Sequence, residues 1–335
     1  MPGVCVPSRT TPEKNDKRVI AMAKMILVTP RGYANYGQEA RKRLEALGYE
    51  MDINTTGKAL SPEAFAAKAK EATGIIVGVD ECDRALLSRC KNLRAIVKFG
   101  VGTDNIDLDA AKEFGIAVGR CVGSNSNSVA EYTVGVMFAA AKHIVASADN
   151  VKNGGWDKLT GCELLGKTVG IIGFGNVGKN VARICSGIGM KTLAYDVFDI
   201  PEQALKAYNT EKRTVEEILR VSDFITVHVP LTAETTNMIA SPQFDRMKPS
   251  AVLINAARGG IVHEKDLLDA LKSGKIYAAA ADVFTSEPPA ADDWIQELLH
   301  LDNFILTSHI AARTAEAEIN TVNISTDVMM DLLSK

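Results

Sequence analysis

The sequence predicts an α/β protein built from two successive parallel-sheet units. Short β-rich runs alternate with helical patterns from Met25 onwards, and the same alternation starts again at Lys167. Strand–helix alternation favours a parallel sheet with helices on both faces. A chain of 335 residues can hold two such units, and a hydrophobic content of 46% is ordinary for a globular protein. We therefore expect two lobes with a cleft between them.

The first unit is predicted to contain four strands separated by helices. The strands are β-rich runs, whereas the helices show apolar residues at helical spacing. The expected strands are residues 25–29, 51–54, 74–77 and 95–97, and the expected helices are 36–47, 62–70 and 83–89. The polar, proline-bearing residues 1–23 indicate a loose arm or an artificial extension, and a transit function stays open.

Two longer helices are expected to link the units. Residues 126–152 are proline-free and rich in Ala, Val and Met, with capping residues before them and a Gly-Gly pair after them. They predict one long helix that crosses from the first unit to the second. Residues 313–333 are again helical and follow the last strand of the second unit, so we expect this helix to return and cover the first sheet.

The second unit begins with a strand at residues 168–172, which runs directly into G-F-G-N-V-G. Gly173 allows a sharp turn, Gly175 allows bare backbone to approach a pyrophosphate, and Gly178 allows close helix packing. The following helix N-terminus offers N–H groups and a positive dipole to phosphates. We predict a dinucleotide site formed by Gly173, Phe174, Gly175, Asn176, Val177 and Gly178. Further strands are expected at 191–195, 223–227, 251–254, 276–281 and 304–306.

Asp196 specifies which dinucleotide is expected. It ends the second strand of this unit, where a carboxylate can accept hydrogen bonds from the adenosine ribose diol. The next residues are Val197 and Phe198, and no Arg or Lys follows closely. A 2′-phosphate would meet negative charge there. The sequence therefore predicts a Rossmann-like unit that binds NAD in preference to NADP.

Composition excludes several other classes of function. A formal net charge of −3 and a pI of about 6.0 give no general attraction to nucleic acid or to an anionic membrane. No run of eighteen apolar residues occurs, and the N-terminus lacks the apolar core of a secretory signal. The six cysteines are scattered, which favours reduced thiols, a cytoplasmic protein and no metal site.

Titratable side chains come directly after four predicted strands of the second unit. Arg258 carries a planar fork of donors that matches a carboxylate. His309 can take or give a proton near neutral pH, and Asp282 and Glu287 lie in a preceding loop. His228 is expected to help wall the cofactor. Each segment alone also fits a structural reading, as a surface arginine, solvated loop acids or a structural histidine.

Taken in order, these segments resemble the D-isomer-specific 2-hydroxyacid dehydrogenases, and most closely their phosphoglycerate dehydrogenase branch. The similarity spans residues 95–317. It is carried by residues 100–105, 125–131, 173–178 with Asp196, 228–232, 255–260, 282–288 and His309.

The resemblance implies a catalytic trio. Arg258 would bind the substrate carboxylate and carbonyl, and His309 would be the acid/base. Glu287 would orient the His309 ring and favour its protonated form. Asp282 would hold the nicotinamide carboxamide, and the backbone at Val101 and Gly102 would receive the substrate carboxylate. Further implied cofactor contacts are His228, Val229, Pro230, Thr232, Ala256 and Ala257.

The resemblance also implies the domain organisation. A discontinuous substrate domain would comprise residues 1–123 and 309–335, and an NAD-binding domain residues 124–308. Family members usually dimerise through the nucleotide lobe, so we expect a homodimer that uses residues 126–152.

Substrate identity is less sharply indicated. Lys98 lies where phosphoglycerate dehydrogenases place a basic residue, and Arg31 is a second candidate for binding a phosphate. Against this, the sequence ends without the serine-sensing domain that many members carry, and Arg313 and His263 depart from the common residues. We expect a dehydrogenase of 3-phosphoglycerate or a close analogue, which would act in serine biosynthesis. The alternatives are a hydroxypyruvate/glyoxylate reductase and, from another class, an NAD-sensing corepressor.

Overall fold

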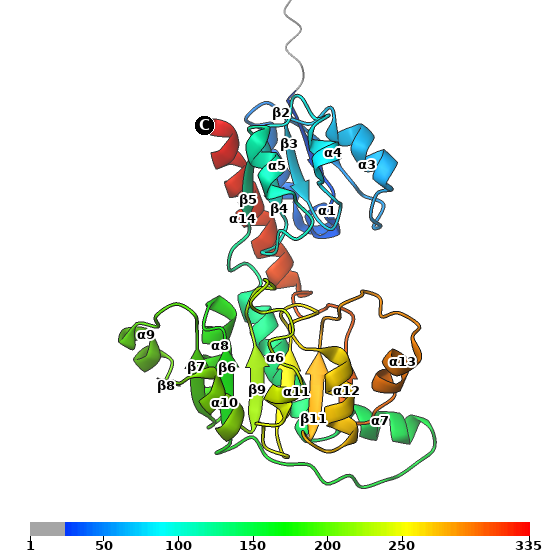
Figure 1. The fold of residues 1–335 in the computed structure, drawn as a ribbon. Coiled ribbons are helices and arrows are strands. Elements are labelled where there is room, and N and C mark those ends of the chain that lie inside the picture. The colour runs from blue at the N-terminus through cyan, green and yellow to red at the C-terminus, as the bar shows by residue number, and fades with distance from the viewer. Residues whose placement is uncertain (1–23) are drawn as a thin grey trace, which may run out of the picture.

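The computed structural model describes residues 24–335, which form two α/β lobes (Figure 1). The predictions for residues 1–23 lie outside the described residues. Each lobe contains one sheet, and all neighbouring strands within both sheets are parallel. This arrangement confirms the predicted fold class.

The first lobe is a five-stranded sheet in the order β2-β1-β3-β4-β5. Its central strands are buried because helices cover both faces. The elements are β1 (Lys24–Val28), α1 (Arg31–Tyr36), α2 (Gln38–Glu45), β2 (Tyr49–Ile53), α3 (Pro62–Ala69), β3 (Gly74–Val77), α4 (Arg84–Leu87), β4 (Ala95–Lys98), α5 (Leu108–Glu113) and β5 (Ala117–Arg120). The helices α1 and α5 and the strand β5 had not been predicted.

The second lobe is a seven-stranded sheet in the order β12-β11-β10-β9-β6-β7-β8. Its elements are β6 (Thr168–Ile172), α8 (Asn176–Gly187), β7 (Lys191–Tyr195), α9 (Glu202–Ala207), β8 (Thr210–Lys212), α10 (Val215–Val221), β9 (Phe224–Val227), α11 (Ser241–Phe244), β10 (Val252–Asn255), α12 (Glu264–Lys272), β11 (Ala278–Ala281), α13 (Asp293–Leu299) and β12 (Phe304–Leu306). All six predicted strands are present, whereas β8, α9, α10, α11 and α13 had not been predicted.

The prediction of one long helix over residues 126–152 is wrong. The segment forms α6 (Ser126–Ala141) and α7 (Ile144–Lys152), which are bent by 62° at the break. His143 lies at this break with a left-handed backbone, φ 52°, and its Nε2 lies 2.5 Å from the Tyr277 hydroxyl. The left-handed backbone of His143 cannot continue a right-handed helix, so the helix breaks at this residue.

Helix α14 (Ala315–Ser334) returns to the first lobe, as expected from its position after the last strand (Figure 1). Met329 and Val322 of α14 are buried in the same core cluster as strands β1, β3 and β4. Glycines in the sheet give the helix room, because a Cβ at Gly119 would lie 2.3 Å from Val328 Cγ1 and one at Gly74 2.8 Å from Met329 Sδ. The chain thus passes between the lobes twice, once between β5 and α6 and once between β12 and α14.

Among the helices of residues 24–335, none alone is long and apolar enough to cross a membrane. Only α6 and α7 taken together satisfy the length and composition requirement, across their bend.

The packing of α14 predicts a stability difference between two glycine substitutions. Gly119→Val should destabilise the protein by about 1–3 kcal/mol, because the added atoms overlap Val328 and force the helix away from the sheet. Gly187→Ala, at the end of α8, should be neutral or stabilising, because a Cβ there meets nothing within 4 Å and Ala favours the helix. Urea unfolding of both variants checks this, and equal midpoints would contradict the packing of α14 on β5.

Candidate active site

Four neighbouring strands of the second lobe end side by side. The last residues of β9, β10, β11 and β12 are aligned across the sheet, where Val227 pairs with Asn255, Asn255 with Ala281, and Ala281 with Leu306. The segments that follow these strands carry the predicted residues of the site. The register of the sheet therefore brings together side chains that are up to 81 residues apart in the chain, from His228 to His309.

His309 follows β12 in an unusual conformation that Asp282 holds. Its backbone is left-handed, φ 55°, which few residues other than glycine adopt. The His309 N–H donates to the Asp282 carbonyl at 2.9 Å, and the Asp282 carboxylate accepts from the N–H groups of Ile310 at 2.8 Å and Ala311 at 2.7 Å. Asp282 is 1% exposed. Three hydrogen bonds thus join Asp282 to this turn and hold the backbone of His309.

The imidazole of His309 is paired with Glu287. The His309 Nδ1 lies 2.8 Å from Glu287 Oε2, and the other carboxylate oxygen accepts the Phe284 N–H at 3.2 Å. A carboxylate at Nδ1 favours the proton there and leaves Nε2 for exchange with a substrate. Both side chains are more than 40% exposed, so they face open space rather than the core. The structure thus shows the predicted pairing of the two side chains, and their role as a general acid/base stays a prediction.

Arg258 lies where the two lobes meet. The Asn255 amide donates to the Arg258 carbonyl at 2.9 Å and accepts the Ala257 N–H at 3.1 Å, which fixes the turn after β10. The guanidinium lies against Gly102 of the first lobe, since a Cβ there would be 1.9 Å from Nη2. Its Nε is 3.3 Å from Asp104 Oδ2. Arg258 therefore reaches the predicted carboxylate-binding loop.

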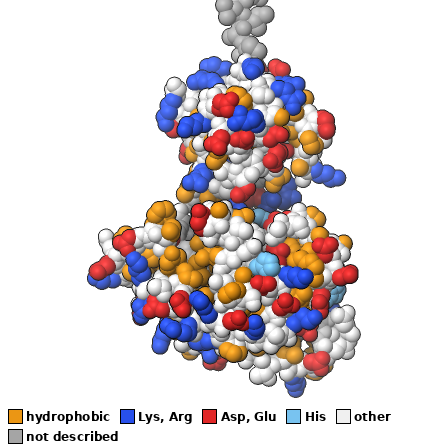
Figure 2. All heavy atoms as spheres, in the orientation of Figure 1, with side chains coloured by type: hydrophobic (Ala, Val, Ile, Leu, Met, Phe, Trp, Pro, Cys, Tyr) orange, Lys and Arg blue, Asp and Glu red, His pale blue; other side chains and the backbone are white. Residues whose placement is uncertain are grey.

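The other predicted substrate residues belong to the first lobe. Figure 2 shows the narrow waist where this lobe meets the second. Lys98 Nζ donates to the Gly78 carbonyl and to Asn105 Oδ1, both at 2.6 Å, and one ammonium donor remains. Burial lowers the pKa of Lys98, while Asp104 opposes this effect and Arg258 adds to it. Val101 is exposed in the loop beside Gly102, and Arg31 is exposed at the start of α1.

The glycine turn after β6 fits a dinucleotide. Gly173 has φ 100°, and a Cβ there would lie 2.5 Å from the His228 carbonyl, whereas one at Gly178 would lie 2.2 Å from the Gly173 carbonyl. A Cβ at Gly175 meets nothing within 4 Å, so a ligand can approach its backbone. Helix α8 starts at Asn176, and no side chain among residues 24–335 caps its N-terminus. These donors and this open backbone suit a pyrophosphate.

Asp196 lies beside this turn. Its Oδ2 accepts the Phe174 N–H at 2.7 Å, and its Oδ1 accepts the Phe198 N–H at 3.0 Å. The carboxylate thus orders the glycine turn and keeps further lone pairs for a ribose. Val197 and Phe198 are each 79% exposed, so apolar surface is available next to it.

His228 carries no positive charge at neutral pH. Burial lowers its pKa to about 3, and its Nε2 lies 2.9 Å from the Thr226 hydroxyl. Val229 contacts the glycine turn, since its Cγ1 lies 3.1 Å from a Cβ built at Gly173. Pro230 and Thr232 are exposed beyond it, and Ala256 and Ala257 are half-buried after β10. The predicted cofactor residues therefore line one edge of the sheet.

The contact of Asp282 with a nicotinamide carboxamide stays a prediction. The structure shows that Asp282 is hydrogen-bonded to the backbone of residues 309–311 and that its carboxylate has a third donor, the Thr307 hydroxyl. Thr307 also pairs with the Tyr132 hydroxyl of α6 at 2.7 Å, and Ser128 of α6 donates to the Ala311 carbonyl at 2.6 Å. Sequence reasoning missed Ser128, Tyr132 and Thr307, because hydroxyls on an apolar helix and after a strand have no distinctive spacing.

Residues 24–335 contain no cluster of His, Cys, Asp and Glu that could hold a metal.

Comparison with known proteins shows the family. Residues 134–311 match the D-isomer specific 2-hydroxyacid dehydrogenase, NAD binding domain. A D-3-phosphoglycerate dehydrogenase of Archaeoglobus fulgidus is 41% identical over 84% of this chain and 53% of its own length. A hydroxypyruvate reductase of Thermotoga maritima is 41% identical over 83% of this chain and 87% of its own. The chain spans about half the length of the phosphoglycerate dehydrogenases that it matches.

Solved structures agree. A D-lactate dehydrogenase of Aquifex aeolicus, complexed with NAD and lactic acid, has a TM-score of 0.77 and 31% identity, and the match covers 92% of this chain and 95% of that one. The prediction of an NAD-binding unit is confirmed by the matched domain. The chain belongs to the family of D-isomer-specific 2-hydroxyacid dehydrogenases.

Proposed function

We propose that this protein is an NAD-dependent oxidoreductase that interconverts a D-2-hydroxy acid and the corresponding 2-keto acid. The observation that carries the proposal is the His309–Glu287 pair, placed at the same sheet edge as Arg258 and the glycine turn. NAD, when bound, accepts the hydride from C2 of the hydroxy acid or returns it to the keto acid.

The side chains supply the remaining chemistry. In oxidation, Nε2 of a neutral His309 takes the hydroxyl proton, and in reduction the protonated ring gives it back. Glu287 holds the ring and balances its positive charge. Arg258 and the Gly102 backbone receive the substrate carboxylate, and the substrate replaces Asp104 as the partner of Arg258. Asp282 would add a contact to the nicotinamide carboxamide.

For the substrate, we propose 3-phosphoglycerate and 3-phosphohydroxypyruvate, which would place the enzyme in serine biosynthesis. Support comes from Lys98, which keeps one ammonium donor near Arg258, and from relatives called D-3-phosphoglycerate dehydrogenase. Hydroxypyruvate and glyoxylate are the alternatives, supported by relatives called hydroxypyruvate reductase and glyoxylate reductase. An NAD-sensing corepressor is disfavoured because such a role has no need of Arg258, Glu287 and His309 in this arrangement.

We also propose a cytoplasmic homodimer. All five described cysteines are free, which suits a reducing compartment. No residue of α7 is buried, and apolar side chains are exposed along and after it, with Ile144 at 53%, Val151 at 48% and Trp156 at 78%. Such a surface is typical of an interface. We place the dimer contact on the second lobe, along residues 126–152 and the segment after them.

His309→Ala should lower kcat by about 10²- to 10⁴-fold, because proton exchange with the C2 oxygen is lost. NADH binding, measured by fluorescence, should be unchanged. The control is His300→Ala, since His300 ends α13 with its ring exposed and away from the cleft residues. Turnover is followed by NADH absorbance with a panel of 2-keto acids. Near-wild-type turnover of His309→Ala would overturn the assignment, and flat traces for the wild type with every acid would favour a binding role.

Lys98→Ala should raise the KM for 3-phosphohydroxypyruvate by at least about tenfold more than the KM for hydroxypyruvate or glyoxylate. The expectation follows from the loss of one charge-assisted hydrogen bond to phosphate. Lys112→Ala, an exposed lysine on α5, serves as the matched control. Equal losses on all three acids would show that Lys98 only supports Gly78 and Asn105.

Replacing Trp156 and Ile144 together by Glu should give a monomer, because two charges would be placed in the proposed apolar contact. Sedimentation equilibrium measures the mass. Val79→Glu, at a side chain 74% exposed on the first lobe, should leave the mass unchanged. A wild-type monomer, or a double variant that remains a dimer, would contradict the proposed interface.

A further inference from the structure

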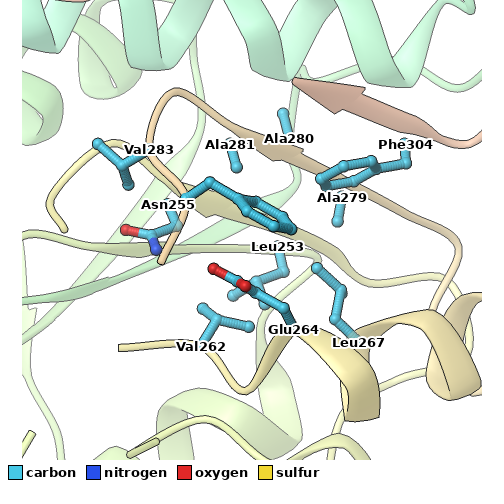
Figure 3. Close-up of a pocket in the computed structure, with 11 residues that line it drawn as sticks. Leu253, Asn255, Val262, Glu264, Leu267, Ala279, Ala280, Ala281, Val283 and Phe304 are labelled. Carbon is cyan, nitrogen blue, oxygen red and sulfur yellow. The ribbon is translucent and has the colours of Figure 1, made fainter. Parts of the chain in front are cut away.

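Glu264, the first residue of α12, lies below the catalytic loops. Its carboxylate points into a small cavity of about 20 Å³ under the ends of β10 and β11, among Asn255, Val262 and Phe284 (Figure 3). Burial raises the pKa of Glu264, and hydrogen bonds from Thr285 oppose the rise. A half-buried carboxylate among mostly apolar side chains costs free energy unless its oxygens accept hydrogen bonds.

One oxygen of Glu264 holds the loop that carries Glu287. Glu264 Oε1 accepts both the N–H of Thr285 at 2.7 Å and its hydroxyl at 2.8 Å. Thr285 precedes Glu287 by two residues. Among residues 24–335, the Glu287 carboxylate bonds only to the Phe284 N–H and to His309, and the side chain is 41% exposed. Its position therefore depends on how the backbone beneath it is held.

The segment that carries Arg258 packs closely against the same backbone. A Cβ at Gly259 would lie 2.2 Å from the carbonyl carbon and oxygen of Phe284 and 2.5 Å from the Thr285 nitrogen. Only glycine allows this approach. Phe284 and Thr285 thus contact Gly259, the neighbour of Arg258, and Thr285 also bonds to Glu264, five residues further along the chain. This arrangement joins the loop of the guanidinium to the loop of the acid/base pair.

We propose that Glu264 is a positioning residue that sets the distance between Glu287 and the His309 imidazole by fixing Thr285. This inference rests on the proposed function, since it concerns the same acid/base pair. Glu264 touches neither His309 nor Arg258 in any hydrogen bond of residues 24–335. It acts through Glu287, and a displacement of catalytic groups by 1 Å can cost about 10²-fold in rate.

Kinetics test the proposal with four single variants and one double variant. Glu264→Ala should lower kcat by about tenfold with little change in KM, because the substrate carboxylate contacts at Arg258 and Gly102 remain. Glu264→Gln should recover most of this loss, since the amide oxygen still accepts from Thr285. Asp269→Ala, at an exposed acid on the same helix, is the matched control. In a Glu287→Gln background, Glu264→Ala should cost less than about twofold, because the two residues act as one unit.

Additive losses in this double-mutant cycle, or a rise in KM without a fall in kcat, would overturn the proposal. If circular dichroism shows that Glu264→Ala does not fold, Thr285→Ala takes its place, because it removes the hydroxyl bond and keeps the backbone. Its kcat should fall by about threefold and again be non-additive with Glu287→Gln. A wild-type kcat for Thr285→Ala would then overturn the proposal.

A spectroscopic readout separates this inference from the proposed function. The chain has five histidines, so the His309 ring signal in a ¹H–¹³C NMR spectrum is identified by its loss in His309→Ala. Glu264→Ala and Glu287→Gln should move this signal in the same direction, and Glu264→Gln should restore it. An unmoved signal in Glu264→Ala contradicts the positioning role even if the enzyme is active. A moved signal in a protein that reduces no 2-keto acid supports the positioning role and rejects the dehydrogenase.

Discussion

The site depends on the hold that Asp282 has on the turn after β12. A left-handed backbone at a residue other than glycine costs free energy, and His309 keeps it because one buried residue accepts three N–H groups in succession. The same carboxylate accepts from Thr307, which is joined to Tyr132 of α6. Helix α6 is thereby connected to the turn that carries His309, so the packing of the second lobe holds this turn.

The other groups are placed by the sheet and by the two chain crossings. The aligned ends of β9 to β12 put four functional segments at one edge of the second lobe, which is where open α/β sheets bind ligands. Arg258 extends from this edge to Gly102 and Asp104 of the first lobe. The loop predicted to bind the substrate carboxylate therefore meets the second lobe at Arg258, although the two belong to different sheets.

Much of this arrangement could be predicted from local pattern. Strand runs and the glycine turn follow from short motifs with a direct physical meaning, whereas the pairing of His309 with Glu287 was expected only from the resemblance to a family. The break at His143 could not, because it combines a left-handed residue with a hydrogen bond to Tyr277, 134 residues away. The same holds for the Asp282 clamp, for Glu264 on Thr285, and for the carbonyl that occupies one donor of Lys98. Such contacts depend on tertiary packing, and they cannot be predicted from the spacing of residues along the chain. The domain boundaries and the roles of individual residues remain proposals.

The central claim is spatial, namely that one guanidinium, one imidazole and its carboxylate converge on the reacting carbon of a bound acid. A crystal structure of the protein with NADH and oxamate, an unreactive analogue of a 2-keto acid, tests it most directly. We predict that the oxamate carboxylate lies on Arg258 and the Gly102 backbone, with its carbonyl oxygen within hydrogen-bond distance of His309 Nε2 and the nicotinamide beside it. Oxamate bound elsewhere, or His309 turned away from it with Glu287 unpaired, would contradict the account.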